Sequence, residues 1–192
     1  MRAFDHFNLI APFYDRIFPP KADRQWVDLL DLPTTGRLLD VGGGTGRVAQ
    51  FLSPHTPQLI LSDLSLPMLR KSQSKVDLQP VCSIAEILPF PDKSFDRIIM
   101  VDAMHHVFEQ EIVAGELIRV LKPGGRLLIE EPDIRSIAVK GIAIGEKLLG
   151  MRSLFLSPPQ IETLFDKFAV EIHTQIDGAI AFILIDRLGE LV

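Results

Sequence analysis

The sequence contains very little cysteine, tryptophan or tyrosine. Each occurs once, as Cys82, Trp26 and Tyr14. A single cysteine excludes an internal disulfide and suits a reducing compartment, so we expect a cytoplasmic protein. Because free cysteine behaves as a small apolar residue, we also expect Cys82 to lie in the core.

Long apolar runs and an excess of basic residues are also missing. The longest apolar stretch, "GAIAFILI", is far shorter than the roughly 18 residues of a membrane span. At the N-terminus, Asp5 and His6 interrupt the apolar run that a signal peptide would need. Acidic residues outnumber basic ones by 25 to 20, which gives a formal charge of −5. We therefore expect neither a membrane span nor a nucleic-acid partner, and the oligomeric state stays open.

Apolar residues are plentiful and regularly spaced. They make up 47% of the 192 residues, enough for one domain with a substantial core. Short apolar runs alternate with amphipathic stretches, and a Pro-Gly turn, "KPGG", follows the third helix. This alternation predicts a doubly wound, Rossmann-like α/β fold with a mostly parallel sheet and helices on both faces. The predicted strands cover 36–41, 58–63, 78–83, 94–103 and 126–131, and the predicted helices cover 47–53, 65–75 and 109–121.

The C-terminal part departs from this alternation. Residues 157–168 predict a helix with Ser157 as its N-cap. Two strands, at 169–177 and 178–188, then follow around an Asp-Gly pair, which favours an antiparallel hairpin. We read residues 1–192 as one domain, in which segments 1–30 and 133–156 cap the carboxyl edge of the sheet, where ligands bind in such folds.

A glycine-rich loop, "LLDVGGGTGRV" at 38–48, follows the first strand directly. A P-loop would need Gly-x-x-x-x-Gly-Lys-Ser/Thr, which is absent here. A dinucleotide fingerprint would need a third glycine where Arg47 stands. Phosphate-binding interpretations are therefore disfavoured, and an NAD-dependent oxidoreductase is a weak alternative.

Two acidic residues accompany the loop. Asp40 lies beside the bend, where a carboxylate would repel a pyrophosphate and favour a positively charged ligand. Asp63 ends the second strand, 21 positions after Gly42, where a carboxylate can accept hydrogen bonds from both ribose hydroxyls. The pattern indicates a cationic ligand that contains a nucleoside.

Further motifs extend this pattern over roughly residues 7–130. They are "FNLIAPFYDRI", "DLSLPMLRKS", "AEILPFPDKSFDRI", "HHV" and "RVLKPGGRLLI". In this order and spacing the sequence resembles the class I S-adenosylmethionine-dependent methyltransferases. More narrowly, it resembles the small-molecule branch that includes the ubiquinone/menaquinone biosynthesis methyltransferases.

The resemblance implies S-adenosylmethionine as cofactor and gives each binding residue a role. Asp63 would hold the ribose, and Tyr14 would close over the cofactor. Ile84 departs from the family, which often has an acidic residue there, so the backbone, Glu86 or apolar packing would hold the adenine amino group. The loop beneath the methionine part would comprise Asp40, Gly42, Gly43, Gly44 and Gly46, and the adenine would contact Leu64, Met68, Ala85 and Glu86.

Methyl transfer from a sulfonium needs an in-line approach at about 3–3.5 Å and no leaving-group acid. A general base helps only where the acceptor carries a proton of high pKa. The candidates are Asp102, His105 and His106. Glu130 and Glu131 are expected to line the acceptor pocket and to favour a polar or cationic acceptor. No metal site is expected, because contiguous residues such as "DAMHH" rarely form a coordination shell. The carboxylates of "EEPD" at 130–133 leave a metal-assisted, catechol-type transfer as a weak alternative.

The predicted function is methyl transfer to a small-molecule acceptor whose identity the sequence does not reveal. A second hypothesis is a protein that binds S-adenosylmethionine without catalysis and acts as a partner or regulator.

Overall fold

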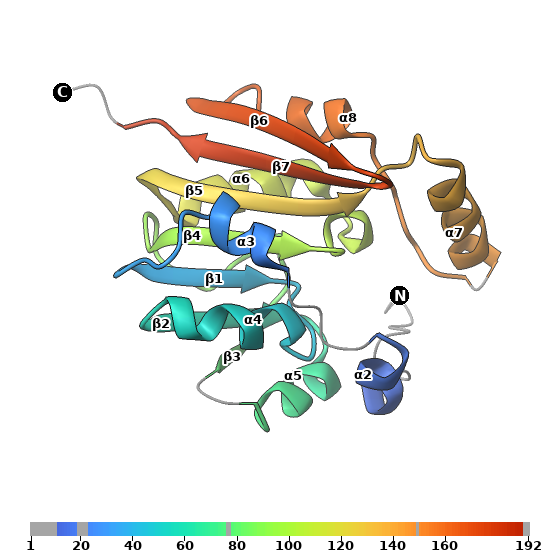
Figure 1. Cartoon of the computed structure of the whole chain (residues 1–192), viewed down its shortest axis with the longest axis horizontal. Coiled ribbons are helices and arrows are strands. Elements are labelled where there is room, and N and C mark those ends of the chain that lie inside the picture. The colour runs from blue at the N-terminus through green and yellow to red at the C-terminus, as the bar shows by residue number, and fades with distance from the viewer. Residues whose placement is uncertain (1–10, 19–22, 76–77, 149, 190–192) are drawn as a thin grey trace.

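The predicted strands form a single sheet in the computed structural model, which describes residues 11–18, 23–75, 78–148 and 150–189. The seven strands lie in the order β3-β2-β1-β4-β5-β7-β6 (Figure 1). The first five are parallel, and β7 pairs antiparallel with both β5 and β6. Their bounds are β1 Arg37–Val41, β2 Gln58–Asp63, β3 Gln79–Cys82, β4 Phe95–Val101, β5 Leu121–Pro132, β6 Val170–Asp177 and β7 Ile180–Arg187. The mostly parallel, doubly wound prediction is confirmed, including the antiparallel C-terminal hairpin.

Helices cover both faces of the sheet, so the central strands are buried on both sides. One apolar cluster packs α6 and α8 against one face, and a second packs α3, α4 and α5 against the other. The α-helices are α2 Tyr14–Ile17, α3 Arg24–Leu29, α4 Arg47–Leu52, α5 Leu66–Ser72, α6 Gln110–Val120, α7 Ile137–Leu148 and α8 Pro158–Thr163. The 3₁₀ turns are η1 Ala11–Phe13, η2 Ser53–His55 and η3 Met104–His106. No helix among the described residues is long and apolar enough to cross a bilayer.

Local sequence signals account for several boundaries. Ser65 caps α5 by accepting from the Met68 amide, at 3.3 Å. Ser157, the predicted N-cap, forms a capping box with Gln160 at the start of α8. Gly178 takes φ +60° in the tight turn between β6 and β7.

Three expectations need correction. The "KPGG" segment is not a separate turn. Helix α6 ends at Val120, and β5 begins at Leu121 and includes this segment. The pairing of β4 with β5 shifts register between Phe95 and Arg97, opposite the segment. The last helix ends at Thr163, and turns follow it. Cys82 is exposed and lies outside the core, since β3 is an edge strand whose side chains are at most partly covered.

The described parts of segments 1–30 and 133–156, which the sequence predicts to cap the sheet, lie partly at its carboxyl edge and partly on one of its faces (Figure 1). Helices α2 and α7 lie at the side toward which β1, β4 and β5 point, so they border the carboxyl ends of these strands (Figure 1). Helix α3 instead packs on a face of the sheet through the buried Trp26. Residues 1–10 and 19–22 of the first segment lie outside the described residues. The strand order reverses between β1 and β4, and such a reversal opens a crevice in α/β folds.

Candidate cofactor and acceptor site

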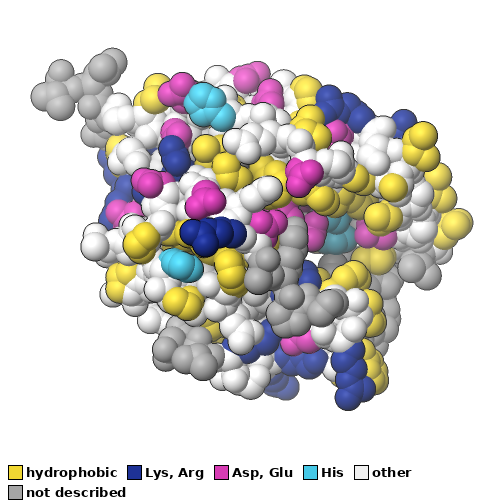
Figure 2. Space-filling model, in the orientation of Figure 1, with side chains coloured by type: hydrophobic (Ala, Val, Ile, Leu, Met, Phe, Trp, Pro, Cys, Tyr) yellow, Lys and Arg dark blue, Asp and Glu magenta, His cyan; other side chains and the backbone are white. Residues whose placement is uncertain are grey.

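A cavity of about 240 Å³ opens at the carboxyl ends of β1, β2 and β4. Figure 2 shows acidic side chains and a histidine gathered in the hollow between the sheet and α7. Most of the residues predicted for the site line this cavity, but Gly46 and His105 do not. The predicted residues in the lining are Tyr14, Asp40, Gly42, Gly43, Gly44, Asp63, Leu64, Met68, Ala85, Glu86, Asp102 and His106.

The glycine turn is closely packed on one side and open on the other. A Cβ at Gly43 would lie 2.0 Å from Leu61 Cδ1, so no larger residue fits there. Gly44 has φ +56°, and a Cβ at that position would meet nothing nearer than Asp63 Oδ2 at 3.9 Å. Backbone at Gly44 can therefore approach a ligand closely. Gly46, with φ +77°, lies behind the turn at the start of α4.

The Asp63 carboxylate is fixed by backbone donors. Its Oδ2 accepts from the Gly44 amide at 2.8 Å, and its Oδ1 accepts from the Ser65 amide at 2.7 Å. A carboxylate is also the kind of group that accepts hydrogen bonds from ligand hydroxyls. The side chain is therefore oriented before any ligand arrives.

Asp40 is buried beneath the glycine turn, with 1% of its surface exposed. Among the described residues, neither of its carboxylate oxygens makes a hydrogen bond of normal geometry. Burial, followed by the nearby charge of Asp63, raises the pKa of Asp40 to about 7. This part of the cavity therefore favours a ligand that carries positive charge.

The region predicted to hold adenine is mainly apolar. Leu64 is half exposed, Met68 is buried, and the exposed Ile84 also lines the cavity. Glu86 uses one oxygen to accept from the amides of Phe108 and Glu109, at 2.8 and 3.4 Å. Glu86 therefore anchors the loop after η3 as well as bordering the cavity.

Helix α2 is held across the glycine turn by polar contacts. The Thr45 hydroxyl donates to Asp15 at 2.5 Å, and Lys75 lies 3.2 Å from the same carboxylate. The Arg47 guanidinium lies 5.3 Å from the centre of the Tyr14 ring. Burial raises the pKa of Tyr14, so its hydroxyl stays protonated in the lining.

The three catalytic candidates separate into two environments. Asp102 and His106 border the cavity, and Asp102 is exposed with φ +51°. Burial, together with neighbouring His105, lowers the pKa of His106 to about 3. His105 is buried outside the lining, with its Nδ1 2.5 Å from Glu131 and its ring stacked 4.1 Å from that of Phe155. Burial alone would lower the pKa of His105, but the Glu131 carboxylate outweighs it and raises that pKa.

Glu130 and Glu131 do not line the cavity, contrary to the sequence-based expectation. Both lie on the central strand β5 and are buried on opposite faces of the sheet. Glu131 accepts from the amides of Ala103 and Met104, at 2.8 and 2.7 Å, in addition to His105. Glu130 accepts from the Trp26 indole. The two carboxylates therefore hold neighbouring elements in place.

Sequence reasoning did not identify Met151, Arg152 and Phe108 in the lining, or Glu146 beside the histidines. Glu146 lies on α7, and the other three lie in loops. No motif marks them, because only the tertiary fold brings them to the cavity.

Comparison with known proteins agrees with this geometry. Residues 39–129 match a family described as a methyltransferase domain. The chain is 35% identical over 139 residues to a demethylmenaquinone methyltransferase of Thermus thermophilus, covering 65% of this chain and 63% of that protein. It is 34% identical over 147 residues to a ubiquinone/menaquinone biosynthesis C-methyltransferase of Geobacter sulfurreducens, covering 68% of this chain and 57% of that protein. The chain thus matches about three fifths of the length of these relatives.

The same fold occurs in solved structures. A methyltransferase from Thermotoga maritima, described as dependent on S-adenosylmethionine, superposes with a TM-score of 0.76 at 23% identity, covering 94% of this chain and 97% of that one. In fold, glycine turn and matched segment the chain resembles the class I S-adenosylmethionine-dependent methyltransferase domains. Within that class, the two relatives named above are methyltransferases of demethylmenaquinone and of ubiquinone/menaquinone biosynthesis. The cofactor of the class is S-adenosylmethionine.

Proposed function

We propose that this chain binds S-adenosylmethionine in the cavity and catalyses transfer of its methyl group to a small-molecule acceptor. The observation that carries the proposal is the pairing of Asp63, fixed by two backbone donors, with Asp40, buried and poor in hydrogen bonds. The first suits ribose hydroxyls, and the second suits a cation. Few ligands other than S-adenosylmethionine combine both features.

The residues present fit this cofactor. Gly43 and Gly44 leave the turn free of side chains where a ligand must approach, and Leu64 and Met68 offer apolar surface for an adenine ring. When bound, the cofactor supplies an electrophilic methyl group on a sulfonium, whose sulfur departs neutral and needs no acid. The contribution of the protein is then to orient the reactants and to exclude water.

The acceptor would enter beside Asp102, His106 and Phe108, at the opening that α7 borders. The exposed Asp102 carboxylate would take up the proton that the methyl acceptor loses. His106 borders the same opening and would contact the acceptor. His105 does not border the cavity and would act by positioning η3 through Glu131.

An aromatic acceptor such as a hydroquinone is the class we favour. The names of both relatives refer to quinones, and the cavity lining is mainly apolar around Ile84, Met100 and Met151. A cytoplasmic location is consistent with the single cysteine, and the charge of −5 gives no support for a nucleic-acid acceptor.

Binding of S-adenosylhomocysteine tests the cofactor assignment directly. At a hundred times its dissociation constant it should stabilise the fold by about 2.7 kcal/mol, while NAD should not. Asp63→Asn should weaken binding at least about tenfold through loss of a charged acceptor, and Asp166→Asn, at an exposed position, should not. Stabilisation by NAD alone would exclude the proposal.

Turnover tests the acceptor assignment. Transfer of labelled methyl from S-adenosylmethionine should be detected with hydroquinones or phenols, and Asp102→Asn should lower kcat more than it changes the affinity for S-adenosylhomocysteine. Cofactor binding without transfer to any aromatic acceptor would exclude this acceptor class.

A further inference from the structure

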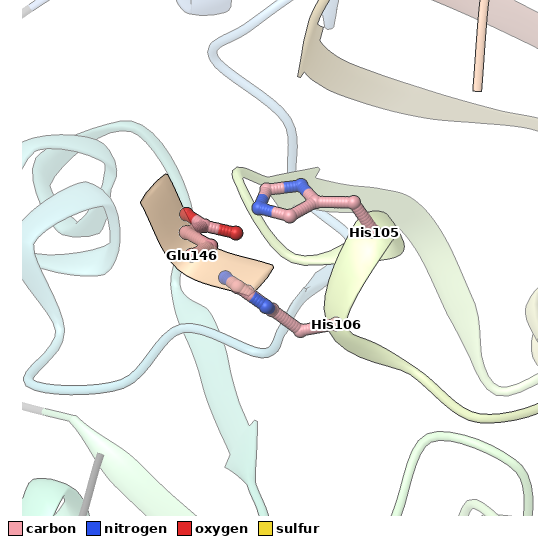
Figure 3. A group of neighbouring side chains, drawn as sticks. All are labelled: His105, His106 and Glu146. Carbon is pink, nitrogen blue, oxygen red and sulfur yellow. The ribbon is translucent and has the colours of Figure 1, made fainter. Parts of the chain in front are cut away.

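Three metal-ligating side chains from two separate segments converge beside the cavity. His105 and His106 come from η3, and Glu146 comes from α7 (Figure 3). One ligand atom of each lies within 4.8 Å of the others. We propose that these residues bind one divalent transition-metal ion, with Zn²⁺ as the best-fitting ion.

Glu146 provides an independent reason to place a cation here. Its Oε2 is buried and has no hydrogen-bond partner among the described residues. A buried carboxylate oxygen without a partner is destabilising, and a bound cation would remove that penalty. The orphaned oxygen belongs to the same side chain that completes the cluster with the two histidines.

The surroundings of His105 match those of a metal-bound histidine. Its Nδ1 contacts the Glu131 carboxylate at 2.5 Å, so Nε2 is the ring atom left to face the cluster. Carboxylates commonly orient metal-binding histidines in this way, through the nitrogen that does not bind the metal. The Phe155 ring, stacked at 16° to the imidazole, holds the same orientation. Ser153 lies 3.3 Å from His106 Nδ1, so each imidazole has a neighbour on its Nδ1 side.

The donor set indicates the kind of ion. Two imidazoles and one carboxylate suit Zn²⁺ and similar ions, and sites with three protein ligands keep one position open. Ligand atoms of bound Zn²⁺ lie roughly 3.3 Å apart, and the three ligand atoms here lie within 4.8 Å of one another, so small side-chain movements would complete the site. Because His106 lines the cavity, the open position would be reachable by an acceptor oxygen.

The sequence alone argues against this site, since "DAMHH" supplies only neighbouring ligands. The structure adds Glu146 from a helix 40 positions further along the chain. The proposal does not depend on the proposed methyl transfer, and it can be tested without cofactor or acceptor.

The experiment uses the full, tag-free chain, cleared of metal with a chelator and dialysed. Titration with Zn²⁺, followed by calorimetry, should show one equivalent bound, and Co²⁺ should give the visible absorption of a four-coordinate site. Glu146→Gln and His106→Gln should each weaken binding at least tenfold. His173→Gln and Glu171→Gln are matched controls on β6, where an exposed histidine and glutamate lie 3.3 Å apart, and they should not change binding.

A second measurement does not depend on affinity. Zn²⁺ should slow backbone hydrogen exchange in residues 137–148 of the wild type and have no such effect in Glu146→Gln. If circular dichroism shows that one variant is unfolded, the other variant and the exchange measurement still test whether the ion binds at this cluster. Absence of binding, or binding that both variants retain, would overturn the proposal. Binding of S-adenosylhomocysteine, measured separately, shows whether the proposed function fails on its own.

Discussion

The indole of Trp26 donates a hydrogen bond to the carboxylate of Glu130, and both side chains are completely buried. Trp26 lies on α3, and Glu130 lies on the central strand β5, 104 positions later in the chain. The bond therefore joins a helix near the start of the chain to the middle of a sheet whose strands all follow that helix in the sequence. An ionisable group in such a place tolerates little loss of its donors.

Trp26→Phe removes that donor and part of the ring volume. We expect a loss of about 2–4 kcal/mol in the free energy of unfolding. Urea unfolding followed by circular dichroism measures it, since the variant lacks the only tryptophan. Adding Glu130→Gln should reduce the loss, because the amide costs less than the carboxylate when the indole is absent. Additive effects of the two substitutions would contradict this coupling.

Asp40 should make the stability of the ligand-free protein depend on pH. Its pKa is raised from 3.8 to about 7, so the folded protein holds a proton that the unfolded chain releases. Its contribution therefore makes the free energy of unfolding fall as pH rises from about 4 to about 7, by a few kcal/mol in order of magnitude. Above pH 7 this contribution is constant. Asp40→Asn should flatten the dependence, and equal slopes in the two proteins would contradict the assignment.

Gly43→Ala should impair the glycine turn. The added methyl would lie 2.0 Å from Leu61 Cδ1 and 2.5 Å from Asp40 Oδ2, so the turn must shift. We expect a loss of about 1–3 kcal/mol in stability and at least tenfold weaker binding of S-adenosylhomocysteine. Gly141→Ala is the matched control, because this glycine lies in α7 with nothing within 4 Å of an added Cβ. It should change stability by less than about 1 kcal/mol.

Asp15→Asn should loosen α2 from the glycine turn. The Thr45 and Lys75 contacts to this carboxylate would weaken, since the amide carries no charge. The expected loss of stability is about 1 kcal/mol, because the contacts are partly buried and the amide can still accept a hydrogen bond. Affinity for S-adenosylhomocysteine should fall a few-fold, with faster hydrogen exchange in residues 11–18. Asp28→Asn, at an exposed position of α3, is the control. An unchanged exchange rate at 11–18 would contradict the role of Asp15.

Local chemistry explains why much of the fold could be predicted from the sequence. The apolar run that ends at Asp63, the N-cap at Ser157 and the turn at Gly178 each depend on neighbouring residues, and the structure contains all three features. The placement of Asp40 and Asp63 at the cavity follows from the same rule, since the carboxyl ends of parallel strands meet at one edge.

The parts that could not be predicted depend on contacts between distant residues. Nothing near Glu130 in the sequence indicates that Trp26 contacts it, and nothing near His105 indicates Glu146. Residue type predicts a core position for Cys82, but its exposure is decided by the position of β3 at the sheet edge. The sequence pattern places Glu130 and Glu131 in the pocket, because it does not reveal the donors within the fold that bind these two carboxylates.

The strand order has a consequence for synthesis on the ribosome. Strand β7, late in the chain, lies between β5 and β6, so one edge of β5 stays open until the hairpin has emerged and inserted. An unpaired edge exposes a row of backbone donors and acceptors that other chains can bind. Nascent chains that stall between β5 and β7 should therefore aggregate, and chaperones that shield strand edges should act in that interval.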